Sequence, residues 1–392
     1  MKNTILFLCI LFTQTLGAQT FSTKVIPAAE IVDEYYNLIK NKRVAVLVNQ
    51  TSVIHQTHLV DSLLHRGINI VKIFAPEHGF RGTENAGEDV KNSVDVKTGL
   101  TISSMYGATK KPTAESMQNI DIVLFDIQDV GARFYTYISS LQYMMEACAE
   151  NKIPMVILDR PNPNGFYIDG PVLEATNKSF VGMQAIPIVH GMTVGEYAMM
   201  LNGERGLNNN LKCNLTVIPC KNYDHSVLYE CPIAPSPNLK SASAILLYPS
   251  LCLFEGTVVS VGRGTEFPFE MWGHPDFKTK TFSFTPVSTS SAKTPVLENK
   301  VCYGVNLHFP AKTILQLLKK QMRLSYLKSA YAMSADTAHF FNDFFIKLAG
   351  TPTFKQQIIA GKSEEEIRNT WKSDIAKFKK IRKKYLLYAD FE

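Results

Sequence analysis

The first half of the chain contains five short, continuous apolar segments, and each of them ends in a polar cluster. They cover residues 43–48, 68–74, 100–102, 120–125 and 154–158. Short apolar runs separated by helical patterns indicate buried parallel strands in βαβ units. Ligands of such sheets bind outside the carboxyl ends of the strands, where the polar clusters gather. The pattern therefore predicts an open α/β sheet with a binding site at its carboxyl edge.

Helical patterns fit between the predicted strands, at residues 57–66, 113–117, 137–151 and 193–203. The last of these begins with Thr193, and Glu196 follows three residues later. This is the capping box, in which each of the two side chains accepts a hydrogen bond from the backbone amide of the other residue. Strands and helices in alternation predict a Rossmann-like parallel sheet with helices on both faces.

The alternation stops after about residue 250. Strands are predicted at residues 256–262, 279–286 and 302–309, and helices at 312–328, 335–349 and 363–385. This order is typical of an α+β arrangement, and residues 232–238, with two prolines, are interpreted as a stiff connector or cleft-edge loop. We expect a Rossmann-like domain at residues 22–250, a smaller α+β domain at residues 251–392, and an active-site cleft between them.

Residues 1–18 have the features of a secretory signal peptide. Lys2 provides the positive charge, residues 5–12 are apolar, and Leu16, Gly17 and Ala18 form a cleavage site with small residues. The apolar stretch is too short for a membrane-spanning helix, which needs ~20 apolar residues. We expect an exported protein, periplasmic or secreted, without a transmembrane segment; a buried N-terminal strand or helix is the alternative.

The charge of the chain gives no case for a polyanionic partner. The net charge is +6, and removal of the signal peptide takes away only Lys2 and leaves +5. Much of this charge lies at residues 372–384, where apolar residues also recur at helical spacing. We interpret this run as a packed helix with a solvated basic face. Neither a nucleic acid nor an obligate protein partner is expected.

Six cysteines follow the signal segment: Cys148, Cys213, Cys220, Cys231, Cys252 and Cys302. An even number in an exported protein permits disulfides. The irregular spacing, without C-x-x-C, favours scattered buried thiols over a disulfide framework or a zinc site. The chain also lacks the G-x-G-x-x-G, P-loop, G-x-S-x-G and H-E-x-x-H motifs. We therefore expect no cofactor and no metal.

The most informative polar cluster is Glu77-His78-Gly79, which follows the second predicted strand. A glutamate on a tight turn at the ligand-binding edge of a sheet is placed to act as a general acid. His78 can orient it, and Arg81 can bind an anionic group of the substrate. The alternative is a polar turn whose carboxylate caps nearby backbone amides.

Carboxylates, an amide, an arginine and aromatic rings follow the fourth predicted strand: Asp126, Gln128, Asp129, Arg133, Tyr135 and Tyr137. This mixture suits a sugar, because carboxylates bind hydroxyl groups and take part in acid/base chemistry while aromatic rings stack on pyranose faces. One of the two aspartates can instead be structural and cap the following helix. A metal site would need His55 and His58 as additional ligands, and their spacing is unremarkable.

Further candidates come from other strand ends and from the second half of the chain. Asn49 ends the first strand, and a proline-rich loop after the fifth strand carries Arg160 and Asn162. The second half supplies Glu255, Arg263 and Glu266. Of these, Glu255 can complete a carboxylate pair with Glu77.

Five motifs resemble the exo-β-N-acetylmuramidase family of the NamZ type. They are Pro-Glu-His-Gly-Phe-Arg-Gly at 76–82, Asp-Ile-Gln-Asp-Val-Gly-Ala-Arg at 126–133, Asp-Arg-Pro-Asn-Pro at 159–163, Phe-Glu-Gly-Thr at 254–257 and Gly-Arg-Gly-Thr at 262–265. The likeness extends from about residue 25 to the C-terminus. It implies a Rossmann-like N-terminal domain and a smaller C-terminal domain, with the active site in the cleft between them.

The resemblance also implies release of N-acetylmuramic acid (MurNAc) from the non-reducing ends of peptidoglycan fragments such as MurNAc-GlcNAc, with the catalytic glutamate at Glu77. Asp129 or Glu255 is the candidate partner. MurNAc carries a lactyl carboxylate, so the site needs a cation, for which an Arg fork is well suited. The candidates are Arg81, Arg133, Arg160 and Arg263.

Three other functions compete with this one. A metal-dependent hydrolase would use His55, His58 and His78 with Asp126 and Asp129. A non-catalytic glycan-binding protein of the cell envelope would bind muropeptides and release no sugar. An exo-hexosaminidase of other specificity would cleave a GlcNAc substrate as fast as a MurNAc substrate.

Overall fold

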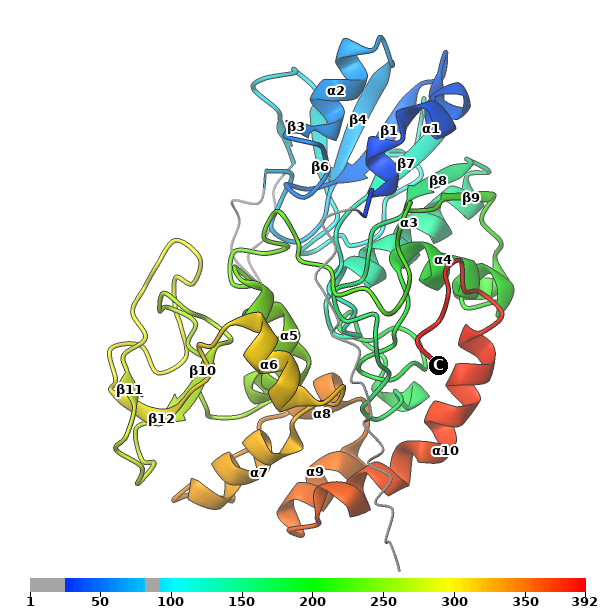
Figure 1. Ribbon diagram of the computed structural model, residues 1–392. Helices are drawn as coiled ribbons and strands as arrows, with labels where there is room; N and C mark the ends of the chain where they lie inside the picture. The colour runs from blue at the N-terminus through cyan, green and yellow to red at the C-terminus, as the bar shows by residue number, and fades with distance from the viewer. Residues whose placement is uncertain (1–24, 82–91) are drawn as a thin grey trace, which may run out of the picture.

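The computed structural model describes residues 25–81 and 92–392, so the predicted signal peptide lies outside the described residues. The described chain forms a sheet-based N-terminal part and a mostly helical C-terminal part that packs beside it (Figure 1). Among these residues, no helix is long and apolar enough to cross a membrane.

The N-terminal part is built on a seven-stranded sheet with the strand order β5-β6-β4-β1-β7-β8-β9. The strands are β1 (Val44–Val48), β4 (Ile70–Ala75), β5 (Ser93–Val94), β6 (Thr101–Ser104), β7 (Ile122–Asp126), β8 (Met155–Leu158) and β9 (Leu215–Ile218). All neighbours pair in parallel except β5, which runs antiparallel to β6 at the sheet edge. The five strands predicted from the apolar segments are confirmed, whereas β9 was not predicted.

Both faces of the sheet are covered by helices. On β1, Val44, Val46 and Val48 pack into one apolar core, and Ala45 and Leu47 pack into another. The first core also contains the helices α1 (Val32–Ile39) and α2 (Leu59–His65), and the second contains α3 (Tyr137–Glu150) and α4 (Val194–Gly203). Successive side chains of a strand point to opposite faces, so a doubly covered strand is apolar throughout. The predicted Rossmann-like layering is confirmed.

The C-terminal part combines a small antiparallel sheet with a group of helices. Its sheet has the order β10-β12-β11, formed by β10 (Met271–His274), β12 (Cys302–Asn306) and β11 (Ser283–Phe284). Its helices are α5 (Ala242–Leu251), α6 (Ala311–Leu318), α7 (Leu324–Met333), α8 (Phe344–Ala349), α9 (Pro352–Ile359) and α10 (Glu364–Arg382). The predicted α+β character of this part is confirmed.

Short elements connect these layers. They are the hairpin strands β2 (Val53–Ile54) and β3 (Thr57–His58) and the 3-10 turns η1 (Ala28–Glu30), η2 (Ala175–Asn177), η3 (Asn208–Asn210) and η4 (Cys252–Gly256). The six cysteines among the described residues are free thiols, and all except Cys231 are buried.

Several element boundaries differ from the predictions. Residues 113–117 form turns instead of a helix, and residues 256–262 contain only isolated bridges after η4. The predicted helix at 312–328 is split into α6 and α7, because Lys319 and Lys320 adopt left-handed φ angles of 52° and 56° that end α6. The predicted capping box of Thr193 and Glu196 is confirmed.

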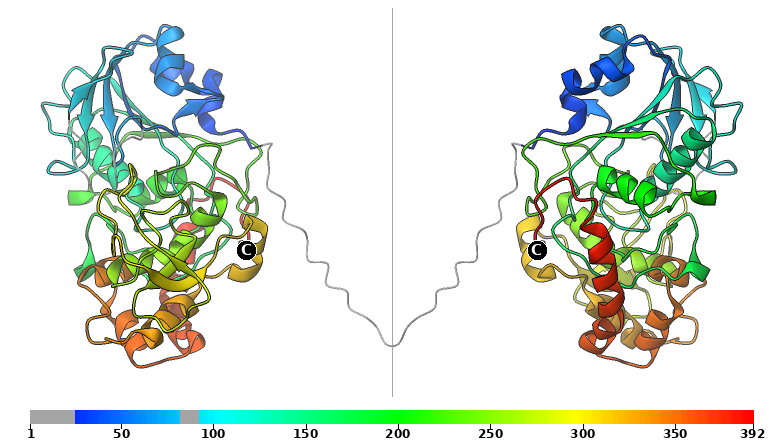
Figure 2. Two further views of the ribbon diagram at one scale, coloured as in Figure 1. Left: turned by 90° about the vertical axis from the view of Figure 1, so that its left-hand side faces the viewer. Right: turned by 90° about the vertical axis from the view of Figure 1, so that its right-hand side faces the viewer.

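The chain end returns to the N-terminal part. α10 runs from the C-terminal helices back along the side of the molecule (Figure 2), where Arg382 donates to the carbonyl oxygen of Gly191 through Nη2 at 2.8 Å. Beyond it, the Tyr388 hydroxyl donates to the buried carboxylate of Asp159 at 2.6 Å. These bonds tie the end of the chain to the N-terminal part.

Candidate active site

A pocket with a volume of about 580 Å³ lies between the carboxyl edge of the large sheet and the start of the C-terminal part. The sheet and the start of α3 supply Glu77, His78, Tyr106, Phe134, Tyr135 and Thr136. The C-terminal part supplies Tyr248, Cys252, Glu255, Arg263, Phe269 and a loop at residues 291–296. The predicted clustering of strand-end residues therefore holds for the turn after β4.

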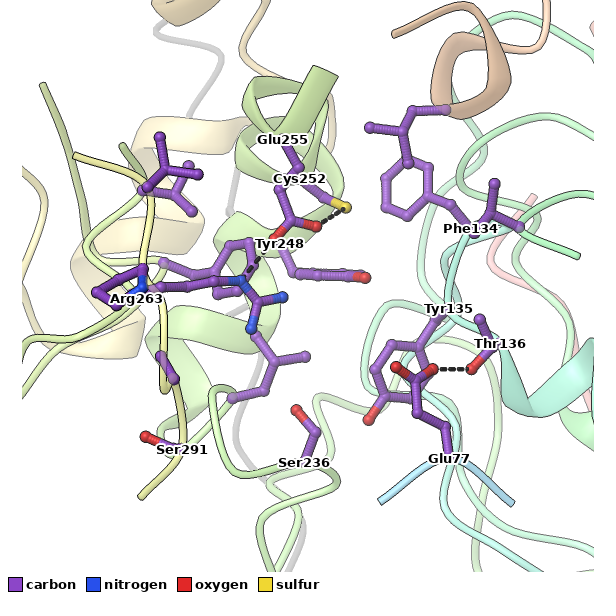
Figure 3. Close-up of a pocket in the computed structure, with 18 of the residues that line it drawn as sticks. Glu77, Phe134, Tyr135, Thr136, Ser236, Tyr248, Cys252, Glu255, Arg263 and Ser291 are labelled. Carbon is purple, nitrogen blue, oxygen red and sulfur yellow. Dashed lines mark hydrogen bonds and ion pairs between the residues drawn. The ribbon is translucent and has the colours of Figure 1, made fainter. Parts of the chain in front are cut away.

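Glu77 lies on a tight turn immediately after β4. The amide of Gly79 donates to the carbonyl oxygen of Pro76 at 3.0 Å, which closes the turn around Glu77 and His78. His78 is buried and has a φ of 70°, a left-handed conformation that few non-glycine residues adopt. The turn points the Glu77 side chain into the pocket (Figure 3).

Thr136 holds one oxygen of the Glu77 carboxylate. Its hydroxyl Oγ1 donates to Oε2 of Glu77 at 2.6 Å. Thr136 is the N-cap residue of α3, but its side chain makes no capping hydrogen bond to the helix. The hydroxyl is used for Glu77 instead, and the carboxylate lies at the positive end of the α3 dipole. The hydrogen bond fixes the direction of the Glu77 side chain.

Glu255 and Arg263 form an ion pair on the opposite wall of the pocket (Figure 3). Nε of Arg263 lies 2.5 Å from Oε1 of Glu255, and the guanidinium lies 5.0 Å from the ring centroid of Phe269. The thiol of Cys252 donates to the other Glu255 oxygen at 3.5 Å. Burial lowers the pKa of Arg263, but the Glu255 carboxylate outweighs burial and raises it above its ordinary value.

Tyr135 and Tyr248 lie between these two walls. Their rings meet edge to face with centroids 5.6 Å apart, and Tyr135 also contacts Tyr137 at 4.8 Å. Burial raises the pKa of both Tyr135 and Tyr248 well above the ordinary value, so their hydroxyls stay protonated and can donate hydrogen bonds. The pocket thus combines ring faces with hydroxyl groups and charges, as a sugar-binding site requires.

A second set of predicted residues forms a buried polar layer, and none of its members lines the pocket. This layer contains Asn49, Asp126, Gln128, Tyr137, Arg160 and Asn162. Asp126 is fully buried. Its carboxylate accepts hydrogen bonds from Nε and Nη2 of Arg160, and Nη2 lies 2.8 Å from Oδ2. Because each charge neutralises the other, neither side chain is directed to a ligand. Arg160 therefore serves a buried ion pair and does not line the pocket.

The uncharged members of this layer also bond within the protein. Asn49 accepts from Thr51, Gln128 donates to the carbonyl oxygen of Pro161 at 2.7 Å, and Asn162 donates to the carbonyl oxygen of Met192 at 2.8 Å. The Tyr137 hydroxyl donates to the carbonyl oxygen of Pro235 at 2.9 Å. The last of these bonds attaches residues 232–238, predicted as a connector, to the start of α3.

Asp129 is buried, and only one of its two carboxyl oxygens is hydrogen-bonded within the described residues. Its Oδ2 accepts from the amide of Gly131 at 2.8 Å, and its Oδ1 has no hydrogen-bond partner among the described residues. Burial raises the pKa of Asp129 to about 7, although the amides of Gly131 and Val130 act in the opposite direction. A carboxyl group that holds its proton near neutral pH can serve as an acid. Asp129 is nevertheless not among the residues that line the pocket.

The remaining predicted residues lie elsewhere. Arg133 is fully buried and donates to the carbonyl oxygens of Pro171, Ile186, Leu348 and Ala349 at 2.7–2.8 Å. Arg81 pairs with Asp95 at 3.0 Å, and Glu266 is exposed. Among the four arginines proposed for a carboxylate, only Arg263 lines the pocket. The guanidinium groups of the other three already donate hydrogen bonds to carbonyl or carboxylate oxygens of the protein.

The residues proposed for a metal site are also separated. His58 bonds to the carbonyl oxygen of Asn49 at 2.9 Å, and His55 lies 3.3 Å from Glu30. Within residues 25–81 and 92–392, no group of three or more His, Cys, Asp or Glu side chains is placed to hold a metal ion.

These features define a two-domain α/β protein with an enzyme-like site. A Rossmann-like sheet presents a carboxylate to the second domain across a polar and aromatic pocket. The sequence matches "Exo-beta-N-acetylmuramidase NamZ, N-terminal" over residues 44–243 and the corresponding C-terminal domain over residues 246–388. The chain therefore belongs to the exo-β-N-acetylmuramidase NamZ family.

Relatives agree with this assignment. The chain is 37% identical to "Peptidoglycan beta-N-acetylmuramidase NamZ" of Bacillus subtilis (strain 168), covering 91% of this chain and 90% of that protein. Two crystal structures of DUF1343 family proteins from Bacteroides fragilis NCTC 9343 are similar. One has a TM-score of 0.87 at 49% identity and the other 0.74 at 29% identity, each covering 94% of this chain and 100% of the other chain.

Proposed function

We propose that this protein is an exo-acting glycoside hydrolase that releases MurNAc from the non-reducing ends of peptidoglycan fragments such as MurNAc-GlcNAc. The observation that carries the proposal is the placement of the Glu77 carboxylate opposite the Arg263–Glu255 pair in one pocket. Family membership supports the reaction, and the pocket supplies the residues for it. Such an activity would serve cell-wall turnover or recycling.

Glu77 is the principal catalytic residue of this account, as general acid or nucleophile. Glycosidases use a pair of carboxyl groups, and the separation of the pair decides the stereochemical outcome: ~5–5.5 Å for retention and ~6.5–9.5 Å for inversion, unless the acetamido group of the substrate assists. Glu255 lines the same pocket as Glu77. Asp129 does not, but it is the carboxyl group whose pKa is raised to about 7 by burial.

Arg263 is the residue that distinguishes MurNAc from GlcNAc in this account. Its Nε is bonded to Glu255, and its two terminal nitrogens make no hydrogen bond within the described part of the chain. Figure 3 shows the guanidinium group directed from the wall toward the interior of the pocket. Two terminal N–H groups in a fixed plane match a carboxylate. We assign the lactyl carboxylate of MurNAc to this position.

The same proposal places the protein outside the cytoplasm. The support is the signal-like composition of residues 1–18 and the nature of the substrate, which occurs in the cell wall. Expression with and without residues 1–18, followed by fractionation, tests this point. Retention of both forms in the cytoplasm would contradict it.

The activity is tested with purified protein and 4-nitrophenyl β-MurNAc, with the 4-nitrophenyl β-GlcNAc analogue measured beside it. We expect release of 4-nitrophenol from the MurNAc compound alone, with the same rate in the presence of EDTA. Equal rates on both compounds would indicate a hexosaminidase of other specificity, and loss of activity with EDTA would indicate a metal-dependent hydrolase. Binding of muropeptides without hydrolysis would indicate a glycan-binding protein.

A further inference from the structure

A second, polar hollow lies beside the pocket, and the two share one stretch of chain as a wall. Tyr106 and Val181 line the pocket, and Phe180 lines the second hollow, whose volume is about 660 Å³. Tyr143 from α3 lines the second hollow as well. Nothing in the proposed cleavage of a MurNAc linkage uses this second space.

Three aromatic rings lead from the pocket to the hollow. The ring centroid of Phe180 lies 5.9 Å from that of Tyr106 and 6.1 Å from that of Tyr143. The planes of Phe180 and Tyr143 are nearly parallel, at 11°. All three side chains are half-buried, so part of each ring is open to solvent. A continuous row of ring surface therefore begins at the pocket and ends in the hollow.

Phe180 is held in place by the same helix that positions Glu77. The Ser139 hydroxyl donates to the carbonyl oxygen of Phe180 at 2.7 Å, and Ser139 lies in the first turn of α3, next to the Thr136 that bonds Glu77. Reciprocal bonds of 3.0 Å between the backbones of Ser179 and Gly182 close the turn that carries Phe180. The ring row thus has a fixed position relative to the catalytic carboxylate.

The hollow offers polar groups next to the rings. Gln184 donates to Gln142 at 2.8 Å, and Gln142 donates to Glu146 at 3.0 Å, which fixes the direction of the two amides. The Ser179 hydroxyl is buried and has no hydrogen-bond partner within the described residues. Ring faces bordered by oriented amides and a hydroxyl suit the apolar faces and hydroxyl edges of a sugar.

We propose that Tyr106, Phe180 and Tyr143 form the binding path for the aglycone, and that the hollow receives its sugars. The occupant is the GlcNAc that follows the cleaved bond, together with the sugars beyond it. The inference rests on the proposed function, because an exo-acting enzyme holds only the terminal MurNAc in its pocket and the rest of the chain must leave along one wall. The ring row is the wall that is continuous with a second hollow.

The test varies the length of the aglycone. Release of MurNAc is measured from methyl β-MurNAc, from MurNAc-GlcNAc and from the peptide-free tetrasaccharide MurNAc-GlcNAc-MurNAc-GlcNAc. We expect Phe180→Ala to lower kcat/KM for the tetrasaccharide about tenfold and to change that for the methyl glycoside less than about twofold, because only the longer aglycone reaches the ring. Phe180→Tyr keeps the ring and should behave like the wild type.

Tyr36→Ala removes a half-buried ring from α1, away from the pocket, and is the matched control for a general effect of losing an aromatic residue. Equal losses on all three substrates, or no loss on any, would overturn the aglycone path and leave the muramidase function standing. No release of MurNAc from any substrate by the wild type would overturn the proposed function, and the path with it.

Discussion

The hydroxyl of Thr136 lies 2.6 Å from Oε2 of Glu77 and joins the start of α3 to the turn after β4. The two residues are far apart in the sequence, and the bond brings a helix N-terminus to the candidate catalytic carboxylate. The direction of Glu77 is thereby set from outside its own turn. Thr136 acts through Glu77 and is a positioning residue.

Removal of this hydroxyl should reduce turnover. We expect Thr136→Val, which keeps the shape of the side chain, to lower kcat on 4-nitrophenyl β-MurNAc roughly tenfold, because a hydrogen bond to a charged group is lost. KM should change little, and the pH profile of kcat should shift. Thr136→Ser keeps the hydroxyl and should restore most of the rate; a serine variant as slow as the valine variant would show that packing, not the hydrogen bond, is important.

Replacement of Arg263 should reduce selectivity for MurNAc. Arg263→Lys keeps the charge beside Glu255 but loses the planar pair of terminal N–H groups. We expect kcat/KM on the MurNAc compound to fall by roughly ten- to a hundredfold, since hydrogen bonds to charged groups contribute ~1.5–3 kcal/mol. The low rate on the GlcNAc analogue should stay unchanged. A proportional loss on both compounds would contradict the assignment of the lactyl carboxylate to Arg263.

Arg133 should be important for stability instead of substrate binding. Its guanidinium is fully buried and donates to four carbonyl oxygens, two of them at the end of α8 in the C-terminal part. Arg133→Met should lower the free energy of unfolding by about 3 kcal/mol or more, because it leaves buried carbonyl groups unpaired. Arg81→Met is the control: that side chain is 37% exposed and pairs with Asp95, so the loss should stay below about 1 kcal/mol. Urea denaturation measures both.

The buried carboxyl group of Asp129 should make stability depend on pH. Burial raises its pKa from an ordinary value of 3.8 to about 7, so the folded state binds more protons than the unfolded state between these values. The free energy of unfolding therefore falls as the pH rises from about 4 to about 7. Asp159, whose pKa is raised to about 6 mainly by burial, acts in the same direction. The difference between the wild type and Asp129→Asn isolates Asp129: the variant should gain relative stability as the pH rises, and parallel pH profiles would contradict this.

The central parallel strands were predictable because they are buried on both faces. β1 and β8 are apolar along their whole length and β7 is apolar as far as Phe125, and no other element type combines this length with that composition so readily. α5 was not predicted. It is buried along nearly all of its length, so its sequence lacks the amphipathic period that marks a helix, and it also contains Pro249. Because α5 was not predicted, Tyr248, which this helix carries into the pocket, was not predicted as a site residue either.

The site was predictable where residue type and local turn agree, as at Glu77 and His78. The arginines were less predictable, because a buried Arg that serves carbonyl groups has the same local sequence signature as one that serves a ligand. The partners of Arg133 and Arg160 are separated from them by 34 to more than 200 positions. Only the three-dimensional arrangement shows that Arg263 keeps its terminal nitrogens for the pocket. Thr136 was expected only at the start of a helix, and its bond to Glu77 depends on how β4 and α3 pack.

The most direct test of the account compares Glu77→Gln with Glu255→Gln on 4-nitrophenyl β-MurNAc. Both substitutions preserve size and remove one carboxylate from the same pocket. We expect the folded Glu77 variant to lose at least about a thousandfold in kcat, whereas Glu255→Gln, which weakens the pairing of Arg263, should act mainly on KM. A comparable loss of kcat in the Glu255 variant would identify Glu255 as the second catalytic carboxyl. Hydrolysis at the wild-type rate by the Glu77 variant would contradict the central assignment.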